Sequence, residues 1–283
     1  MTDLRITHIG GPTALIAIDG WRLLTDPTFD PPGTRYGFGW GTGSVKTSGP
    51  ALAPGDLGRI DAVLLTHDHH DDNLDPSGRA FLPSAEVVVT TVSGSRRLGN
   101  GARGLEPWST TRLEAPGRRP LEVTATPCRH GPPLSRPVTG DVIGFALGWD
   151  GQSRRALWIS GDTVLYDGVR EVADRLEVDV ALLHLGGVRF PVTGPVRYTM
   201  TAEDAVELCG LLEPRVAIPV HYEGWRHFHE NRDAIERAFA RAPAAVRGRI
   251  RWLPLGVEVE LTAASGEPSS RSEPTEVRSA ALG

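Results

Sequence analysis

Four apolar, strand-like runs of this sequence each end in a histidine or an aspartate. The runs are IDAVLLT before His67, LEVTATPC shortly before His130, RALWISG before Asp162, and RVAIPV before His221. A lone histidine at a strand end is an ordinary capped or packed residue, but four such ends are hard to obtain by chance. Because a sheet gathers the ends of its strands at one edge, we expect these side chains to converge there.

The remaining runs define the class of fold. Further strand-like runs are LRITHIGG, TALIAIDG, WRLLTDP, AEVVVTT, DVIGFALGWDG, DVALLHLGG and the closing IRWLPLGVEVEL. TAEDAVELCGLL, with Thr201 as its N-cap, and NRDAIERAFARA have helical spacing. Strand pairs early and helix–strand units late predict a single α/β (α+β) domain of stacked layers over residues 1–262. Residues 263–283, which are polar and contain Gly, Pro and Ser, are predicted to be a disordered tail.

Charge and composition argue against several classes of protein. The net charge of −5 and the lack of an extended Lys/Arg run disfavour a nucleic-acid partner. No apolar stretch approaches the ~18 residues of a membrane span, and MTDLRITHIGG lacks the pattern of a signal peptide. Cys128 and Cys209, far apart in the sequence, fit a reducing cytoplasm. We expect a cytoplasmic protein with a small-molecule substrate, no nucleic acid and no membrane; the sequence leaves a homo-oligomer open.

The stretch LLTHDHHDDNLD, residues 64–75, is the densest group of candidate ligands. On an extended segment, residues two apart point to the same side, so His67, His69 and Asp71 would share one face. Imidazole and carboxylate together suit Zn²⁺, Mn²⁺ or Fe²⁺. Asp68 and His70 have the opposite parity, where solvent exposure or a supporting contact is expected in place of coordination. The pattern therefore predicts a metal site built on His67 and His69.

The stretch THDHHD at residues 66–71, followed by His130, Asp162 and His221, resembles the metallo-β-lactamase fold superfamily. Within it, GGPTALIAIDG…LLTDPTFDPPG and MTAEDAVEL…VAIPVHYEG are similar to the L-ascorbate-6-phosphate lactonase-like branch of metal-dependent hydrolases. The resemblance covers residues from about 4 to 261. It implies a four-layer αββα sandwich with the site at one edge of the two sheets.

The resemblance also implies a ligand set for one or two divalent metal ions, zinc first, with manganese or iron as alternatives. The implied ligands are His67, His69 and His130 for the first site, Asp162 for a bridge between two ions, and Asp71 and His221 for the second site.

At one position the sequence departs from the family motif, which is His-x-His-x-Asp-His. Its last position is here Asp72, followed by Asn73. If Asp72 reaches an ion, the oxygen ligand shifts the preference of the second site toward Mn²⁺ or Fe²⁺. If it does not, the enzyme works with one metal, or His70 takes over as the ligand. In a third interpretation Asp72 binds backbone amides or Asn73 and never contacts metal, and the sequence leaves all three open.

The activity that the resemblance implies is hydrolysis of a small molecule. A metal lowers the pKa of bound water toward ~7, and the metal-bound hydroxide would cleave an ester or lactone, an amide or a phosphoester bond. Asp71 would orient that hydroxide or accept its proton. His184, at the end of ALLH, would either bond a substrate oxyanion or support a ligand, and simple packing is also compatible. The alternatives are an iron redox enzyme on the same fold and a metal-binding protein with a degraded second site.

Two further segments carry candidate residues. The Gly- and Pro-rich residues 30–55 are predicted to be a long loop, whose Tyr36, Phe38 and Trp40 would line a substrate pocket or pack on the loop itself. His227 and His229, in GWRHFHENRD, lie in a helix-like region and are expected to face solvent.

Overall fold

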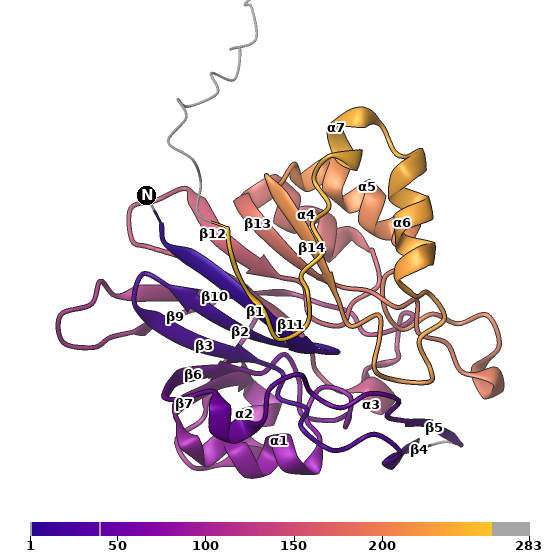
Figure 1. Ribbon diagram of the computed structural model, residues 1–283, viewed down its shortest axis with the longest axis horizontal. Helices are drawn as coiled ribbons and strands as arrows, with labels where there is room; N and C mark the ends of the chain where they lie inside the picture. Colours follow the sequence, from indigo (N-terminus) through magenta and orange to yellow (C-terminus); the bar gives the residue numbers. More distant parts are fainter. Residues whose placement is uncertain (1, 40, 262–283) are drawn as a thin grey trace, which may run out of the picture.

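Two large β-sheets pack against each other in the computed structural model, which describes residues 2–39 and 41–261 (Figure 1). Helices α1 and α2 cover the outer side of one sheet, and α4 to α7 cover the outer side of the other. The predicted four-layer αββα sandwich is therefore confirmed. Trp40 and the predicted tail, residues 263–283, lie outside the described residues, so the domain boundary at residue 262 stays a prediction.

The first sheet has seven strands among the described residues. In sheet order they are β15 (Glu258–Glu260), β1 (Leu4–Gly10), β2 (Thr13–Ile18), β3 (Trp21–Thr25), β6 (Ile60–Leu64), β7 (Ala85–Thr91) and β8 (Arg103–Leu105). The pairs from β15 to β3 are antiparallel, and those from β3 to β8 are parallel. The carboxyl ends of β3 and β6 therefore lie side by side, which brings the segments that follow them together.

The second sheet has six strands in the same part of the chain. In sheet order they are β14 (Val216–Val220), β13 (Glu177–His184), β12 (Arg154–Ile159), β11 (Ile143–Gly148), β10 (Leu121–Pro127) and β9 (Thr110–Leu113). Strands β11 and β12 form the predicted antiparallel hairpin. Strands β12, β13 and β14 are parallel, so their carboxyl ends also meet at one edge.

The helices lie between or beside the strands of each half. They are α1 (Pro76–Phe81), α2 (Val92–Leu98), α3 (Arg136–Thr139), α4 (Asp167–Arg175), α5 (Ala202–Leu212), α6 (Arg232–Arg241) and α7 (Ala244–Arg247), with 3₁₀ turns at Pro54–Asp56, Leu82–Ser84 and Pro191–Thr193. Helix α5 begins after the predicted cap, Thr201, whose hydroxyl accepts from the N–H of Asp204 over 3.1 Å. No helix of the described residues is long and apolar enough to span a bilayer.

The core has one layer between the sheets and one under each set of helices. Strand β2 shows why its sequence forms a buried strand: Ile16 and Ile18 face the other sheet, whereas Leu15 faces the opposite way, toward the layer that contains Phe81 of α1. The near-continuous apolar run TALIAI is therefore buried on both faces, as is typical of a strand inside a layered sandwich.

Residues 30–55 are not the strandless loop that the sequence predicts. They contain β4 (Arg35–Gly39) and β5 (Thr42–Val45), which form a separate two-stranded sheet. Gly39 and Gly41 have φ of 82° and 76°, a conformation that costs glycine little, and this turn lets the hairpin close. The sequence of residues 30–55 predicted a loop because glycine and proline are rare in strands, whereas β4 and β5 pair despite their glycines.

Candidate metal centre

The strand ends predicted to carry ligands converge at one edge of the two sheets. Within the described residues, two groups of three side chains each bring one ligand atom per residue within 4.8 Å of the others. The first group is His67, His70 and His130, and the second is Asp72, Asp162 and His221. Six potential ligands thus come from the segments that follow β6, β10, β12 and β14.

The segment after β6 is bent, which decides which of its side chains meet. The chain bends at Thr66 and again at Asp68, and residues 70–74 form a helical turn. In that turn the N–H groups of Asn73 and Leu74 donate to the carbonyl of His70 over 3.1 and 3.0 Å. Residues two apart do not share a side on such a path, and His70, not His69, joins His67.

The position and tautomer of His67 are set by its neighbour Thr66. The carboxylate of Asp26, at the end of β3, accepts from the N–H of Thr66 over 2.7 Å and from its hydroxyl over 3.0 Å. The hydroxyl can then accept from Nδ1 of His67, which lies 3.1 Å away. This arrangement leaves the lone pair on Nε2 of His67, a buried atom that has no partner among the described residues.

A backbone carbonyl orients His130 in the same manner. The carbonyl of Tyr198 lies 2.8 Å from Nδ1 of His130, so that nitrogen must carry the proton. Nε2 of His130 therefore presents a lone pair, and it lies 3.1 Å from Nδ1 of His70. The first group is thus a set of three imidazoles whose free nitrogens face one another, which suits a divalent ion such as Zn²⁺.

The second group contains two carboxylates and one imidazole, all buried. Nδ1 of His221 lies 3.4 Å from Oδ1 of Asp162, and Nε2 lies 3.6 Å from Oδ2 of Asp72. Both carboxylate oxygens of Asp162 and Oδ1 of Asp72 are buried without a hydrogen-bond partner among the described residues. Unpaired carboxylate oxygens are costly inside a protein unless they coordinate a cation.

His221 has a strained backbone at this point. Its φ is 56°, which is uncommon for a residue with a side chain. Its N–H donates to the carbonyl of Gly11 over 2.9 Å, and a Cβ on Gly186 would lie 2.7 Å from its carbonyl. Neighbouring backbone therefore holds His221 in a conformation that directs its ring toward the two aspartates, and strain of this kind clusters at functional sites.

Burial keeps the imidazoles neutral, which is the form that binds metal. Burial and the neighbouring His130 lower the pKa of His70 to about 3, and burial lowers that of His221 to about 4. Burial, Asp72 and Asp26 raise the pKa of Asp162 well above its usual value. Burial acts in the same direction on Asp72, but its contacts with His221 and His227 outweigh it and lower the pKa. The raised pKa of Asp162 shows that two ionised carboxylates side by side would need a neighbouring cation, and a divalent ion would supply that charge.

Two predicted ligands, His69 and Asp71, lie outside both groups. The ring of His69 packs against Gly140, where a Cβ would approach Nδ1 to 2.2 Å, and Nδ1 lies 3.3 Å from the guanidinium of Arg97. Asp71 is half-buried on the helical turn, and burial with the nearby Asp72 raises its pKa to about 6. The placement predicted for both residues is wrong because parity was counted along an extended segment, whereas the chain bends and then turns.

With one extra residue after His67, the segment follows the family order His…His-x-Asp. In this register His70 and Asp72 occupy the second and third ligand positions, and Asn73 stands where the last histidine is expected. The amide of Asn73 is buried and faces Asp162, whose raised pKa it opposes. In this register the sequence departs from the motif at the extra residue after His67 and at Asn73, and Asp72 contributes to the second group.

His227 is a site residue that the sequence did not reveal. It is buried rather than solvent-exposed, and its Nε2 lies 3.0 Å from Oδ2 of Asp72. Helix α6 begins only at Arg232, so the region around His227 is a loop. His229 points elsewhere and contacts the carbonyl of Arg189. The expectation that both histidines face solvent on a helix is wrong for His227.

His184 lies below the second group at the end of β13. Its ring is buried, with Nε2 3.3 Å from Oδ2 of Asp26 and its centroid 5.7 Å from that of His221. Asp26 also accepts hydrogen bonds from Thr66, so the contact between His184 and Asp26 links the end of β13 with the start of the ligand segment. Because His184 is fully buried beside His221, it is better placed to support a ligand than to contact a substrate.

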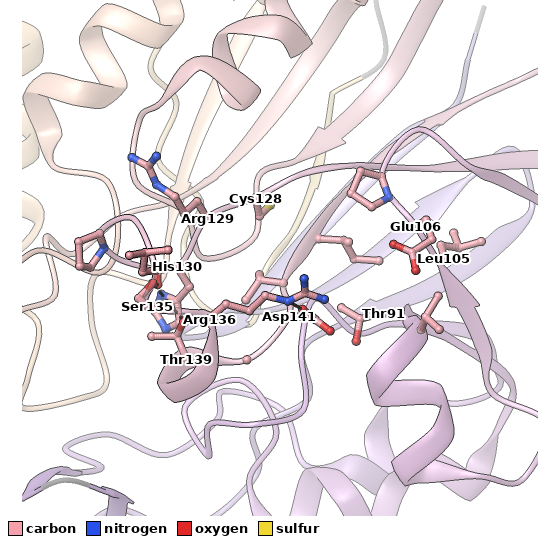
Figure 2. Close-up of a pocket in the computed structure, with 17 residues that line it drawn as sticks. Thr91, Leu105, Glu106, Cys128, Arg129, His130, Ser135, Arg136, Thr139 and Asp141 are labelled. Atoms are coloured by element: carbon pink, nitrogen blue, oxygen red, sulfur yellow. Dashed lines mark hydrogen bonds and ion pairs between the residues drawn. The ribbon is translucent and has the colours of Figure 1, made fainter.

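Two cavities adjoin the first group. One is small and opens over His70, Asp72 and His130 among aromatic and aliphatic side chains. The other, of about 410 Å³, is shown in Figure 2 and contains Glu106, Cys128 and the ion pair of Arg136 with Asp141. His130 and Thr139 line both cavities, so the segment 130–140 lies between the small pocket and the larger cavity.

A two-sheet sandwich with histidines and aspartates gathered at one sheet edge defines a metallo-β-lactamase-type hydrolase. The sequence profile described as the beta-lactamase superfamily domain matches residues 21–222, and the chain belongs to this family. Among curated relatives, a UPF0173 metal-dependent hydrolase of Opitutus terrae is 31% identical over 224 residues, which cover 77% of this chain and 85% of that protein. The chain is thus a metal-dependent hydrolase of the metallo-β-lactamase superfamily.

Solved structures share the fold at low sequence identity. The isothiocyanate hydrolase from Delia radicum gut bacteria is 20% identical, with a TM-score of 0.74 over 90% of this chain and 98% of that one. CmlA, a diiron β-hydroxylase from Streptomyces venezuelae, is 17% identical, with a TM-score of 0.64 over 93% of this chain and 54% of that one. At this distance the likeness concerns the fold, and the chemistry of this chain has to be argued from its own residues.

Proposed function

We propose that this protein hydrolyses a small molecule at a centre of one or two divalent ions held by the two groups. The ligands would be His67, His70 and His130 for one ion, and Asp72, Asp162 and His221 for a second. The single observation that carries the proposal is the convergence of these six side chains at one sheet edge.

The donor set fits metal ions on its own terms. Nε2 of His67, Oδ1 of Asp72, both oxygens of Asp162 and both nitrogens of His221 are buried without hydrogen-bond partners among the described residues. Such atoms would destabilise the fold unless they bind something. Nitrogen donors in one group and mainly oxygen donors in the other suit zinc at the first and zinc, manganese or iron at the second.

Bound divalent ions supply Lewis-acid polarisation of the scissile group and acidification of water at neutral pH. The chain's own residues fix the geometry for this chemistry. Thr66 and the carbonyl of Tyr198 set the tautomers of His67 and His130, and His227 holds one oxygen of Asp72. Asp71 is half-buried on the helical turn and His184 is buried beside Asp26 and His221, so our proposal gives neither a catalytic role.

The scissile bond is proposed at the level of class. An ester or lactone, an amide and a phosphoester are the candidates, and the lactonase-like resemblance of the sequence favours the first. The fold likeness to an isothiocyanate hydrolase adds the isothiocyanate, another neutral carbon electrophile, to the set. A panel of these four substrate types, assayed with the metal-loaded protein, would identify the bond.

Removal of the metal tests the proposal. Exhaustive chelation should abolish turnover of every active substrate, and addition of Zn²⁺, Mn²⁺ or Fe²⁺ should restore it. His67→Ala should lose bound metal, as measured by elemental analysis, while His229→Ala, an exposed histidine of the same chain, should keep it. Full turnover by a preparation with less than one tenth of an equivalent of metal would refute the proposal.

An iron redox enzyme is the second candidate, favoured by the carboxylates of the second group. Asp72 and Asp162 are oxygen donors, which suit iron better than an all-histidine site does. Elemental analysis of protein purified without chelators separates the candidates, together with oxygen consumption after reduction. A zinc-loaded protein that hydrolyses without oxygen excludes the redox candidate; two ions per chain would also exclude a degraded second site.

A further inference from the structure

The small pocket over the first group has an aromatic wall. The rings of Phe38 and Phe190 lie with centroids 6.0 Å apart at an interplanar angle of 70°, and Phe190 meets Tyr198 at 5.6 Å and 64°. Both contacts are edge-to-face arrangements, which hold rings in defined positions. Phe38 comes from the β4–β5 hairpin and the other two from the segment after β13, so two distant parts of the chain build one wall.

This wall stands directly beside the proposed ligands. The ring of Phe190 stacks on His227 at 5.5 Å and 16°, and that of Phe38 lies 5.5 Å from His70. Val138 and Val188 line the same pocket. A group attached to a bond at the ligand nitrogens would therefore contact aromatic and aliphatic carbon.

The described residues that line the pocket include no lysine or arginine that could pair with an anion. Among the described residues that line it, the titratable groups are His70, Asp72, His130, His227 and Tyr198, and none is lysine or arginine. The arginines of the neighbouring segment are engaged elsewhere: Arg136 pairs with Asp141, and the guanidinium of Arg129 lies 4.5 Å from the ring centroid of Tyr166. A phosphate or carboxylate beside the scissile bond would be desolvated there without a lysine or arginine among the described lining residues to pair with it.

Apolar side chains continue from the pocket to the surface. Val138, on α3, lines the pocket and is 44% exposed, and Val192, beside the lining residue Thr193, is 60% exposed. Such exposed aliphatic residues at the rim of a pocket extend its apolar character outward.

We propose that this pocket selects neutral substrates that carry an aromatic or branched aliphatic group next to the scissile bond, and rejects those with an anionic group there. The inference rests on the proposed function, because it assumes that the bond is held at the metal ligands. It adds the substrate class of that site, which we infer from Phe38, Phe190 and the absence of lysine and arginine among the described lining residues.

Binding of three hydroxamates to the metal-loaded full-length protein tests this selection. Acetohydroxamate, benzohydroxamate and para-carboxybenzohydroxamate share one metal-chelating group and differ only in what they place in the pocket. Isothermal titration should give a Kd for benzohydroxamate at least about tenfold below that of acetohydroxamate, and the added carboxylate should remove this gain. Equal affinities, or tighter binding of the carboxylate, would overturn the inference.

Variants of the wall locate the effect. Phe38→Ala, Phe190→Ala and Val138→Ser should each weaken benzohydroxamate several-fold or more and leave acetohydroxamate unchanged, with Leu211→Ala on α5 as the matched control. Elemental analysis of each protein distinguishes a failure of the proposed function, which requires metal, from a failure of the inference about the pocket. Acetohydroxamate that binds the wild-type protein as tightly without metal as with it would refute the proposed function, whereas unchanged benzohydroxamate binding by metal-loaded variants would refute only the inference.

Discussion

Nε2 of His227 lies 3.0 Å from Oδ2 of Asp72, across 155 residues of sequence. An ionised carboxylate only accepts hydrogen bonds, so His227 donates from Nε2. This bond occupies one oxygen of Asp72 and leaves Oδ1, which has no partner among the described residues, for an ion. His227 is therefore placed to orient a ligand of the second group without being one.

His227→Ala should weaken the second metal site. Loss of the hydrogen bond frees the carboxylate of Asp72 to rotate, and removal of such supporting contacts typically lowers metal affinity about 10- to 100-fold. Metal titration monitored by calorimetry should show this loss for one ion only. His229→Ala, which alters a histidine two residues away that contacts the carbonyl of Arg189, is the matched control. Equal metal affinity of the two variants would contradict this role.

Two alignments of the motif differ in whether His69 or His70 is the second histidine ligand. His70→Ala should lose the ion of the first group, because its Nδ1 faces Nε2 of His130 at 3.1 Å. His69→Ala should retain it, because that ring lies against Gly140 and Arg97. Elemental analysis of both variants, purified side by side, reports the difference. Retention of metal by His70→Ala and its loss from His69→Ala would instead support His69 as the ligand, as alternation along an extended segment predicts.

A buried ion pair anchors the ligand segment from its other end. Oδ2 of Asp75 accepts from Nζ of Lys46 over 2.9 Å and from the N–H of Asp30 over 2.7 Å, while Oδ1 accepts from the N–H groups of Phe29 and Gly78. Asp75 thus joins the start of α1 to the segment after β3. Both charged side chains are almost fully buried.

Asp75→Ala should strongly destabilise the fold. The substitution leaves the ammonium of Lys46 buried without its partner, and breaking a buried pair on one side costs about 3–5 kcal/mol. Urea unfolding of the metal-free protein should show this loss. Asp174→Ala, at an exposed position of α4, should change the free energy of unfolding by less than about 0.5 kcal/mol. A loss below about 1 kcal/mol for Asp75→Ala would contradict the anchoring role.

The layered fold could be predicted from the sequence because its signals are local. The buried strands contain the uninterrupted apolar runs ALIAI and ALWI, and the cap at Thr201 marks the start of α5. The convergence of strand ends follows from parallel pairing, which the helix–strand order of the second half already indicates. These features need no knowledge of contacts between distant residues.

The inner arrangement of the site could not be predicted in the same way. Side chains alternate between two sides only on an extended chain, and the helical turn at residues 70–74 breaks this alternation. The signal that the extended segment was ending was Asp75-Pro76, an N-cap followed by a proline at the first helical position. His227 is turned inward because the carbonyl of Gly186 accepts from the N–H groups of His229 and Glu230. That contact joins two loops far apart in sequence, so no local pattern announces it.

Arg118 and Asp61, remote from the metal ligands, form a pair whose effect on stability should depend on pH. The guanidinium donates from both terminal nitrogens to the two oxygens of Asp61, over 2.6 and 3.0 Å. Burial would raise the pKa of Asp61, but the bonds from Arg118 and from the N–H of Arg22 outweigh it and lower the pKa below its usual value. The unfolded chain therefore binds more protons, so this stabilisation is present above the unfolded pKa of about 3.9 and is lost as pH falls through the folded value.

Arg118→Met should lower the free energy of unfolding at pH 7 by about 1–2 kcal/mol, because it removes a charge-assisted pair. The difference from the wild type should narrow as pH falls below about 4. It should not vanish, because the guanidinium also lies 4.4 Å from the ring centroid of Trp21 and that contact does not titrate. Urea unfolding between pH 3 and pH 7 measures the difference, with Arg112→Met, which breaks a solvent-exposed pair, as the control. A difference that stays constant over this range would assign the effect of Arg118 to contacts that do not titrate, which are the ring of Trp21 and the carbonyl of Gly20.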